Sequence, residues 1–311
     1  MGASILRTPL DEMYLGVLAN MDEVAWDEFD QPVEMMDMFN VQTGISGVSF
    51  LNDLIVTGLG YAVDKPEGTP SQLDTIYEAG SKKYTPKVKS LMIIITEEAV
   101  TDNKYIKILE SARGFVKSFK ATKERVLASV INNCMTTETT ADGVALASTA
   151  HLIYPTGATG KNTLSTAADM SVTSVQLAMN DIDATVNERG IPAIISAGRC
   201  FVQNPAMEML ACEIFKSYGR SDTTNRADNA FKLLPQYSGM QILKKRWLND
   251  ADAWGFLPAK NKDHGLKYRE WWPFRTYASE DFETGDMKYK ATERYIAGAT
   301  KWQGFYYVPG A

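Results

Sequence analysis

The chain has 311 residues, of which 45% are hydrophobic and 23% charged, an ordinary balance for a globular protein with a substantial core. It contains no run of about 18 apolar residues that could span a membrane and no secretory signal, and its net charge of −6 argues against a nucleic-acid reader with a basic face. Three widely spaced cysteines argue against a disulfide framework and fit a reducing compartment.

Residues 1–45 show no sustained periodicity, which predicts an extended arm rather than a domain. Residues 1–40 carry nine acids against the single base Arg7, a balance of −8, whereas residues 79–125 carry eleven bases against five acids, a balance of +6. Two segments of opposite charge could pair within one subunit or between neighbours, although solvated faces are the usual explanation of such runs.

Residues 46–95 have the composition of strands and turns. Two β-prone runs, 76–79 and 88–95, flank the turn-like residues 80–83, and this pattern predicts a hairpin. Its tip would carry Lys82, Lys83 and Lys87, so we expect the tip to project into solvent or onto a partner.

From Asp102 to near Met135, apolar residues recur at mostly three- and four-residue steps, which predicts one long amphipathic helix. At 1.5 Å per residue this is a rod of roughly 50 Å. A domain of this size cannot cover such a rod on all sides, so the architecture should be elongated.

After a loop-like stretch, the remaining residues predict two more helices and a series of strands. One helix covers residues 171–187, and another opens at Asn204 and Pro205, a cap residue followed by proline at the first helical position. A buried strand is predicted at 193–202 and an exposed loop at 217–229, and later strands at 241–243, 254–257, 266–272, 287–296 and 305–308. Together these elements predict a mixed α+β chain with two lobes.

No coherent catalytic, cofactor or metal site emerges from the sequence. Residues 155–162 resemble a phosphate loop, but Pro155 replaces the required glycine and Asn162 the hydroxyl that would hold magnesium. His151 and His264 have no second ligand at metal-binding spacing, and the pair Glu97 and Glu98 fits helix capping better than acid–base catalysis. These absences favour a structural role, without enzyme activity or a cofactor.

Four segments resemble the major head subunits of Mu-like bacteriophages. Residues 142–151 are similar to that family's D-G-x-x-L-x-S-x-x-H stretch, and 161–164 to the Asn-rich turn that follows it. Residues 199–208 are similar to its step from a strand to a proline-led helix, and 248–254 to its turn before an aromatic strand. The resemblance covers roughly residues 75–311 in order.

The resemblance implies a Hong Kong 97-like coat fold and a structural role in the virion, after assembly in the host cytoplasm. It divides the chain into an N-terminal arm (1–45), an extended loop with flanking strands (46–95), a peripheral domain (96–164) with a spine helix at about 102–135, an axial domain (165–260) and strands that return to the peripheral domain (261–311).

The implied function is self-assembly into hexamers and pentamers of an icosahedral head that encloses double-stranded DNA. A separate scaffold protein is expected, because 45 residues before the hairpin leave no room for a scaffolding segment. A portal, and in some cases a decoration protein, would complete the particle. We further hypothesise that the acidic arm contacts the basic hairpin or the rod of an adjacent subunit, an attraction that salt should weaken. The residues concerned are Asp22, Glu23, Asp27, Glu28, Asp30, Lys82, Lys83 and Lys87.

Three other interpretations stay open at this point. An encapsulin-like compartment shares the fold but houses an enzyme cargo, and a particle with DNA and a portal would distinguish the two. An enzyme of unrecognised family predicts a small oligomer with a concave pocket. A tail or baseplate protein would assemble as rings or tubes.

Overall fold

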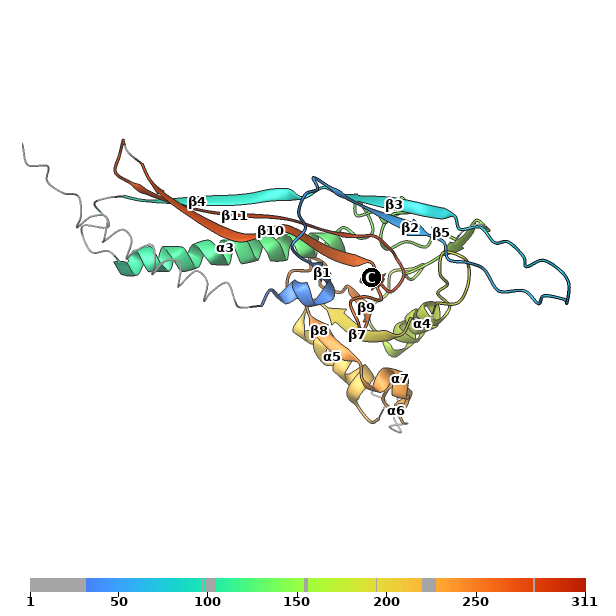
Figure 1. Cartoon of the computed structure of the whole chain (residues 1–311). Coiled ribbons are helices and arrows are strands. Elements are labelled where there is room, and N and C mark those ends of the chain that lie inside the picture. The colour runs from blue at the N-terminus through green and yellow to red at the C-terminus, as the bar shows by residue number, and fades with distance from the viewer. Residues whose placement is uncertain are drawn as a thin grey trace, which may run out of the picture.

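Two four-stranded sheets and one long helix organise the protein (Figure 1). The computed structural model describes residues 32–96, 98, 105–153, 156–193, 195–219, 228–281 and 283–311. No helix within these residues combines the length and the apolar character that a bilayer crossing requires. The mixture of helices and strands agrees with the α+β class predicted from the sequence.

The first sheet has the strand order β1-β10-β11-β4, and helix α3 (Tyr105–Asn132) runs along one of its faces (Figure 1). Its strands are β1 (Asn40–Gln42), β10 (Leu266–Glu280), β11 (Met287–Ala299) and β4 (Lys87–Ile95). Phe115 of α3 packs on Tyr289, and Phe119 packs edge-on against Phe274. The predicted rod is thus confirmed over these 28 residues, about 42 Å. The expected cap, Asp102, lies outside the described residues.

One ion pair is buried between α3 and this sheet. Lys123 Nζ of α3 lies 3.1 Å from a carboxylate oxygen of Glu293 and 3.9 Å from one of Glu270. The Glu293 side chain is fully buried, and this burial raises the pKa of its carboxyl even though Lys123 opposes the shift. The helix is therefore attached to the sheet by charge as well as by its aromatic face.

The second sheet has the order β12-β9-β7-β8 and forms its own core with the remaining helices. Its strands are β12 (Tyr306–Val308), β9 (Trp254–Pro258), β7 (Ala197–Val202) and β8 (Gln241–Lys244), and the helices are α4 (Val172–Asp183), α5 (Pro205–Lys216), α6 (Ala230–Leu233) and α7 (Pro235–Ser238). The predicted start of α5 is confirmed, because Asn204 accepts a hydrogen bond from the backbone N–H of Met207 at 2.8 Å. The α4 prediction was too long at its end, where an isolated bridge from Val186 to Pro192 replaces helix.

Two predictions for the C-terminal half need correction. We expected residues 261–311 to return to the α3 side; β10 and β11 do, but β12 pairs with β9 in the second sheet. Of the loop expected to be exposed at 217–229, residues 220–227 lie outside the described residues. Asn229 at its end is buried, because its amide donates to the carbonyls of Ile214 and Ser217 at 2.7 and 3.0 Å.

The predicted hairpin between residues 76–79 and 88–95 is wrong. β3 (Glu78–Tyr84) pairs with β2 (Leu51–Val56), whereas β4 pairs with β11 in the first sheet. Gly80, expected in the turn, lies within β3 at a φ of 139°, where an added Cβ would stand 2.1 Å from the carbonyl oxygen of Ala141. The glycine therefore permits a close packing contact and does not form a turn. The true hairpin is β2–β3, closed by residues 57–77.

Candidate subunit-contact site

The β2–β3 hairpin projects from one end of the molecule, opposite to the direction in which α3 and the β10–β11 turn extend (Figure 1). Its loop, residues 57–77, exposes apolar side chains that nothing else in the described chain covers. Leu73 is 95% exposed and Tyr61 is 73% exposed. Other exposed apolar residues of the loop are Leu59, Val63, Ile76 and Tyr77. Such a concentration is typical of a surface that another molecule covers.

The base of the hairpin is held by a buried polar network around Asp53 of β2. Its carboxylate accepts hydrogen bonds from Lys267 at 2.8 Å, from Thr300 at 2.9 Å and from the guanidinium of Arg269. Burial alone would raise the pKa of Asp53, but the bonds and charges of Lys267, Thr300 and Arg269 outweigh it and hold the pKa below its usual value. The Tyr84 hydroxyl of β3 lies 2.8 Å from that of Thr300, so both strands are attached to the same point.

A second attachment lies at the root of the loop. The Arg189 guanidinium, from the segment after α4, pairs with Asp74 and lies 5.3 Å from the Tyr77 ring centroid. Asp74 also accepts the backbone N–H of Gly60 at 2.6 Å. These bonds hold Asp74 and Tyr77, while Leu73 beside them stays exposed. The hairpin is thus fixed at its base, and the apolar side chains of its loop are exposed to solvent.

The candidate basic residues do not lie together at a projecting tip. Lys82 points back into its own chain, where it donates to Thr139 O at 2.5 Å and pairs with Glu138 at 3.2 Å. Lys83 is exposed and lies over the ring of Phe50, and Lys87 is exposed at the start of β4. The acidic candidates, Asp22, Glu23, Asp27, Glu28 and Asp30, lie outside the described residues.

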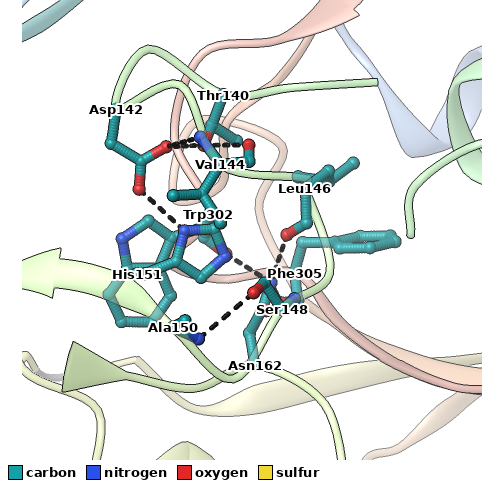
Figure 2. Close-up of polar contacts among 10 residues, drawn as sticks. All are labelled: Thr140, Asp142, Val144, Leu146, Ser148, Ala150, His151, Asn162, Trp302 and Phe305. Carbon is teal, nitrogen blue, oxygen red and sulfur yellow. Dashed lines mark hydrogen bonds and ion pairs between the residues drawn. The ribbon is translucent and has the colours of Figure 1, made fainter. Parts of the chain in front are cut away.

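The stretch 142–151 forms a buried clamp (Figure 2). It lies beside the hairpin base, because Ala141, just before it, packs against Gly80 of β3. His151 Nδ1 lies 2.7 Å from the carboxylate of Asp142, which also accepts the backbone N–H of Val144 at 3.1 Å. The fully buried His151 ring stacks on Trp302 with 4.7 Å between centroids and 7° between planes. Burial opposes ionisation of Asp142, but the bonds from His151 and Thr140 keep its pKa below the usual value.

Asn162 completes this clamp from the next turn (Figure 2). Its buried amide donates to the carbonyls of Leu146 at 2.7 Å and Phe305 at 3.1 Å, and its side-chain oxygen accepts the backbone N–H of Ser148 at 2.9 Å. The neighbouring Lys161 pairs with Asp181 at 2.7 Å. Asn162, from the stretch that resembles a phosphate loop, therefore connects residues 146–148 to Phe305 near the end of the chain.

Sequence reasoning missed the partnership of these residues, although the stretch 142–151 contains both Asp142 and His151. Trp302, which stacks on His151, is a core residue. Asp53 and Arg269 carried no local signal, since they are over two hundred positions apart in sequence. Over the described part of the chain, no group of three or more His, Cys, Asp or Glu side chains could hold a metal ion.

A family model described as "Phage capsid protein" matches residues 78–308, which is most of the chain. This chain belongs to the phage capsid protein family. The match begins at β3 and runs through the clamp to the last strand of the capsid protein. No curated protein matches it in sequence.

Solved structures share the fold of this capsid protein at low sequence identity. The capsid of Myoviridae phage XM1 is 10% identical, with a TM-score of 0.52 over 90% of this chain and 92% of the other. The virus-like particle from Pyrococcus furiosus is 11% identical, with a TM-score of 0.52 over 93% and 98%. The procapsid of bacteriophage JBD30 is 11% identical, with a TM-score of 0.51 over 99% and 77%. These similarities show that the capsid protein has a tailed-phage capsid fold.

Proposed function

We propose that this capsid protein is the major head subunit of a tailed bacteriophage and assembles into hexamers and pentamers of an icosahedral shell around double-stranded DNA. The observation that carries the proposal is the β2–β3 hairpin, fixed at its base and bare along its loop. An isolated subunit gains nothing from exposing Leu73 and Tyr61 to water, whereas a neighbour that covers them gains the free energy of apolar burial.

The finer details belong to the same proposal. The Mu-like stretch 142–151, here a buried clamp, supports a head subunit of the Mu-like type with a Hong Kong 97-like division of the chain. In that division residues 1–45 are the arm, 46–95 the extended loop, 96–164 the peripheral domain, 165–260 the axial domain and 261–311 largely returning strands. A separate scaffold, a portal and a decoration protein would be its partners, and assembly would take place in the host cytoplasm before the subunit enters the virion.

Particle formation tests the proposal directly. The purified chain should form closed shells in negative-stain microscopy and sediment as megadalton particles. Leu73→Asp should raise the critical concentration for assembly about 30-fold, because burying one leucine contributes roughly 2 kcal/mol to each contact. Ser165→Asp, which adds the same charge at an exposed position outside the hairpin, is the control and should assemble normally. A chain that stays monomeric under all assembly conditions, or a Leu73→Asp variant that assembles like wild type, would contradict this function.

A compartment that houses a protein cargo is the second candidate, since the virus-like particle from Pyrococcus furiosus shares the fold over almost its whole length. The two functions differ in what the shell contains. Particles isolated from cells that make the complete virion should contain double-stranded DNA and one portal vertex in the head interpretation. Particles with an enzyme cargo and no DNA would favour the compartment.

A further inference from the structure

One face of the first sheet is left bare by the described chain. α3 covers the face that carries Phe274 and Tyr289, and the opposite face, here called the outer face, points away from the helix (Figure 1). Four cross-strand rows of β10, β11 and β4 make up the outer face: Trp272–Arg294–Val88, Arg275–Thr292–Ser90, Tyr277–Lys290–Met92 and Ser279–Lys288–Ile94.

These rows place three kinds of side chain in parallel bands. The β10 band carries the aromatic rings of Trp272 and Tyr277, the latter 51% exposed, and the β4 band is largely aliphatic, with Val88, Met92 and Ile94 each about half exposed. Arg294, Lys290 and Lys288 of β11 lie between these two bands, and Arg275 lies within the β10 band. None of the twelve side chains in the rows is acidic. A binding partner would therefore need to supply negative charge and apolar groups side by side.

Three cations of this face lie against its aromatic rings, whereas the fourth, Lys288, pairs with Asp281 at the end of the sheet. Lys290 lies 5.5 Å from the Tyr277 ring centroid, and Arg275 and Arg294 lie 5.5 and 5.2 Å from that of Trp272. The Nε atom of Arg294 is buried and has no hydrogen-bond partner in the described structure. Cation–π contacts orient Arg275, Lys290 and Arg294 without neutralising them, so these three cations stay available to an anion.

We propose that the outer face binds the acidic N-terminal segment, residues 1–31, of a second copy of the chain. This inference rests on the proposed function and names one of its contacts. The segment carries seven acids and one base, a net charge of −6, and its aromatic residues Trp26 and Phe29 stand among Asp27, Glu28 and Asp30. Acidic groups suit the cation rows, and interleaved aromatic groups suit the apolar bands. DNA would suit the cations but would leave the aliphatic β4 band exposed.

A second copy fits better than the same chain. The short helix η1 (Glu34–Met38), which follows the segment, packs on α3, where Glu124 accepts the backbone N–H groups of Glu34 and Met35. The described chain therefore begins on the α3 side of the sheet, and the sheet lies between that point and the outer face. The outer face therefore replaces Lys82 as the expected binding site of the acidic segment, because Lys82 pairs with Glu138 in its own chain.

Isotope-resolved photocrosslinking tests the contact. Subunits with Tyr277→p-benzoylphenylalanine and a normal isotope content are mixed with ¹⁵N-labelled wild-type subunits, assembled and irradiated. Crosslinks from position 277 to ¹⁵N-labelled peptides of residues 1–31 are expected, with a yield that falls as salt is added. Crosslinks within one chain, to packaged DNA or to other regions, or no crosslink at all, would overturn the inference and leave the proposed function standing if particles form. Absence of particles from the wild-type chain would overturn both.

Charge reversal gives a second, independent test. Arg275→Glu with Lys290→Glu should raise the critical concentration for assembly about tenfold. Asp27→Lys with Asp30→Lys should have a similar effect without touching the sheet, and the four changes combined should recover at least part of the loss. Lys260→Glu with Lys262→Glu, an equal charge change in an exposed loop, should assemble normally. Lack of any recovery in the combined variant would refute the pairing.

Discussion

The hairpin base offers the sharpest test of how the structure holds its projecting element. Asp53→Asn removes the carboxylate that pairs with Lys267 and Arg269, whose side chains are largely buried there. The amide can accept only part of the three hydrogen bonds and neutralises neither cation. A lost hydrogen bond to a charged group costs about 1.5–3 kcal/mol, so we expect the hairpin to be attached about 2 kcal/mol more weakly.

Hydrogen exchange of unassembled subunits measures this attachment locally. A loss of 2 kcal/mol corresponds to opening about 30 times more often, so the amides of β2 and β3 should exchange about 30-fold faster while those of β7 and β9 stay unchanged. Asp64→Asn, in the exposed loop of the same hairpin, is the control and should exchange like wild type. Equal protection of β2 in the Asp53→Asn variant and in wild type would show that the network does not hold the hairpin.

The same carboxylate predicts a pH dependence. The pKa of Asp53 is lower in the folded chain than its ordinary value near 3.8, so its contribution is fully present above that value. It is lost as the pH falls through the lowered folded pKa. In wild type, the protection of the β2 amides against hydrogen exchange should therefore fall as the pH is lowered. In the Asp53→Asn variant, the share of this loss that comes from protonating Asp53 should be absent.

Three further predictions concern the core. Asn162→Ala should lower the free energy of unfolding by about 3 kcal/mol in urea titrations, because it leaves three buried backbone groups without their partner. Burial and the nearby Arg199 lower the pKa of His264 to about 4, so stability should fall by up to about 3 kcal/mol as the pH drops from 6.5 towards 4, and His264→Gln should flatten that slope. Lys123→Met should cost about 3–5 kcal/mol because Glu293 stays buried without its cation, and adding Glu293→Met should restore part of the loss in thermal denaturation.

Local signals predicted the helices well and the strand partners poorly. The long amphipathic stripe and the Asn204–Pro205 start describe short-range physics, and both are present in the structure. The hairpin was misplaced because residues 80–83 have turn-like composition, whereas their real role depends on Ala141, some sixty positions later. Local sequence does not specify the partner of β3, because the loop that joins β2 to β3 is long and carries no tight-turn motif.

The functional elements show the same limit more strongly. The basic balance of residues 79–125 predicted a segment that could pair with the acidic arm, but Lys82 and Lys123 are each paired within the chain, with Glu138 and Glu293. Other exposed cations, Arg275 and Lys290, lie on β10 and β11 beside aromatic rings. Net charge in a sequence window does not distinguish a paired lysine from a free one, because pairing is decided by tertiary contacts.

The arrangement of the bare surfaces constrains the kind of assembly. The hairpin loop and the outer face of the first sheet are different surfaces, and they lie on different parts of an elongated molecule (Figure 1). A two-fold dimer pairs one surface with its own copy, whereas surfaces of different chemistry are satisfied by head-to-tail contacts. Head-to-tail contacts close into rings when the rotation allows and continue as lattices when several such contacts exist on each subunit. A rigid hairpin base then has a clear purpose, because a ring closes only if every subunit holds its projecting loop at the same angle.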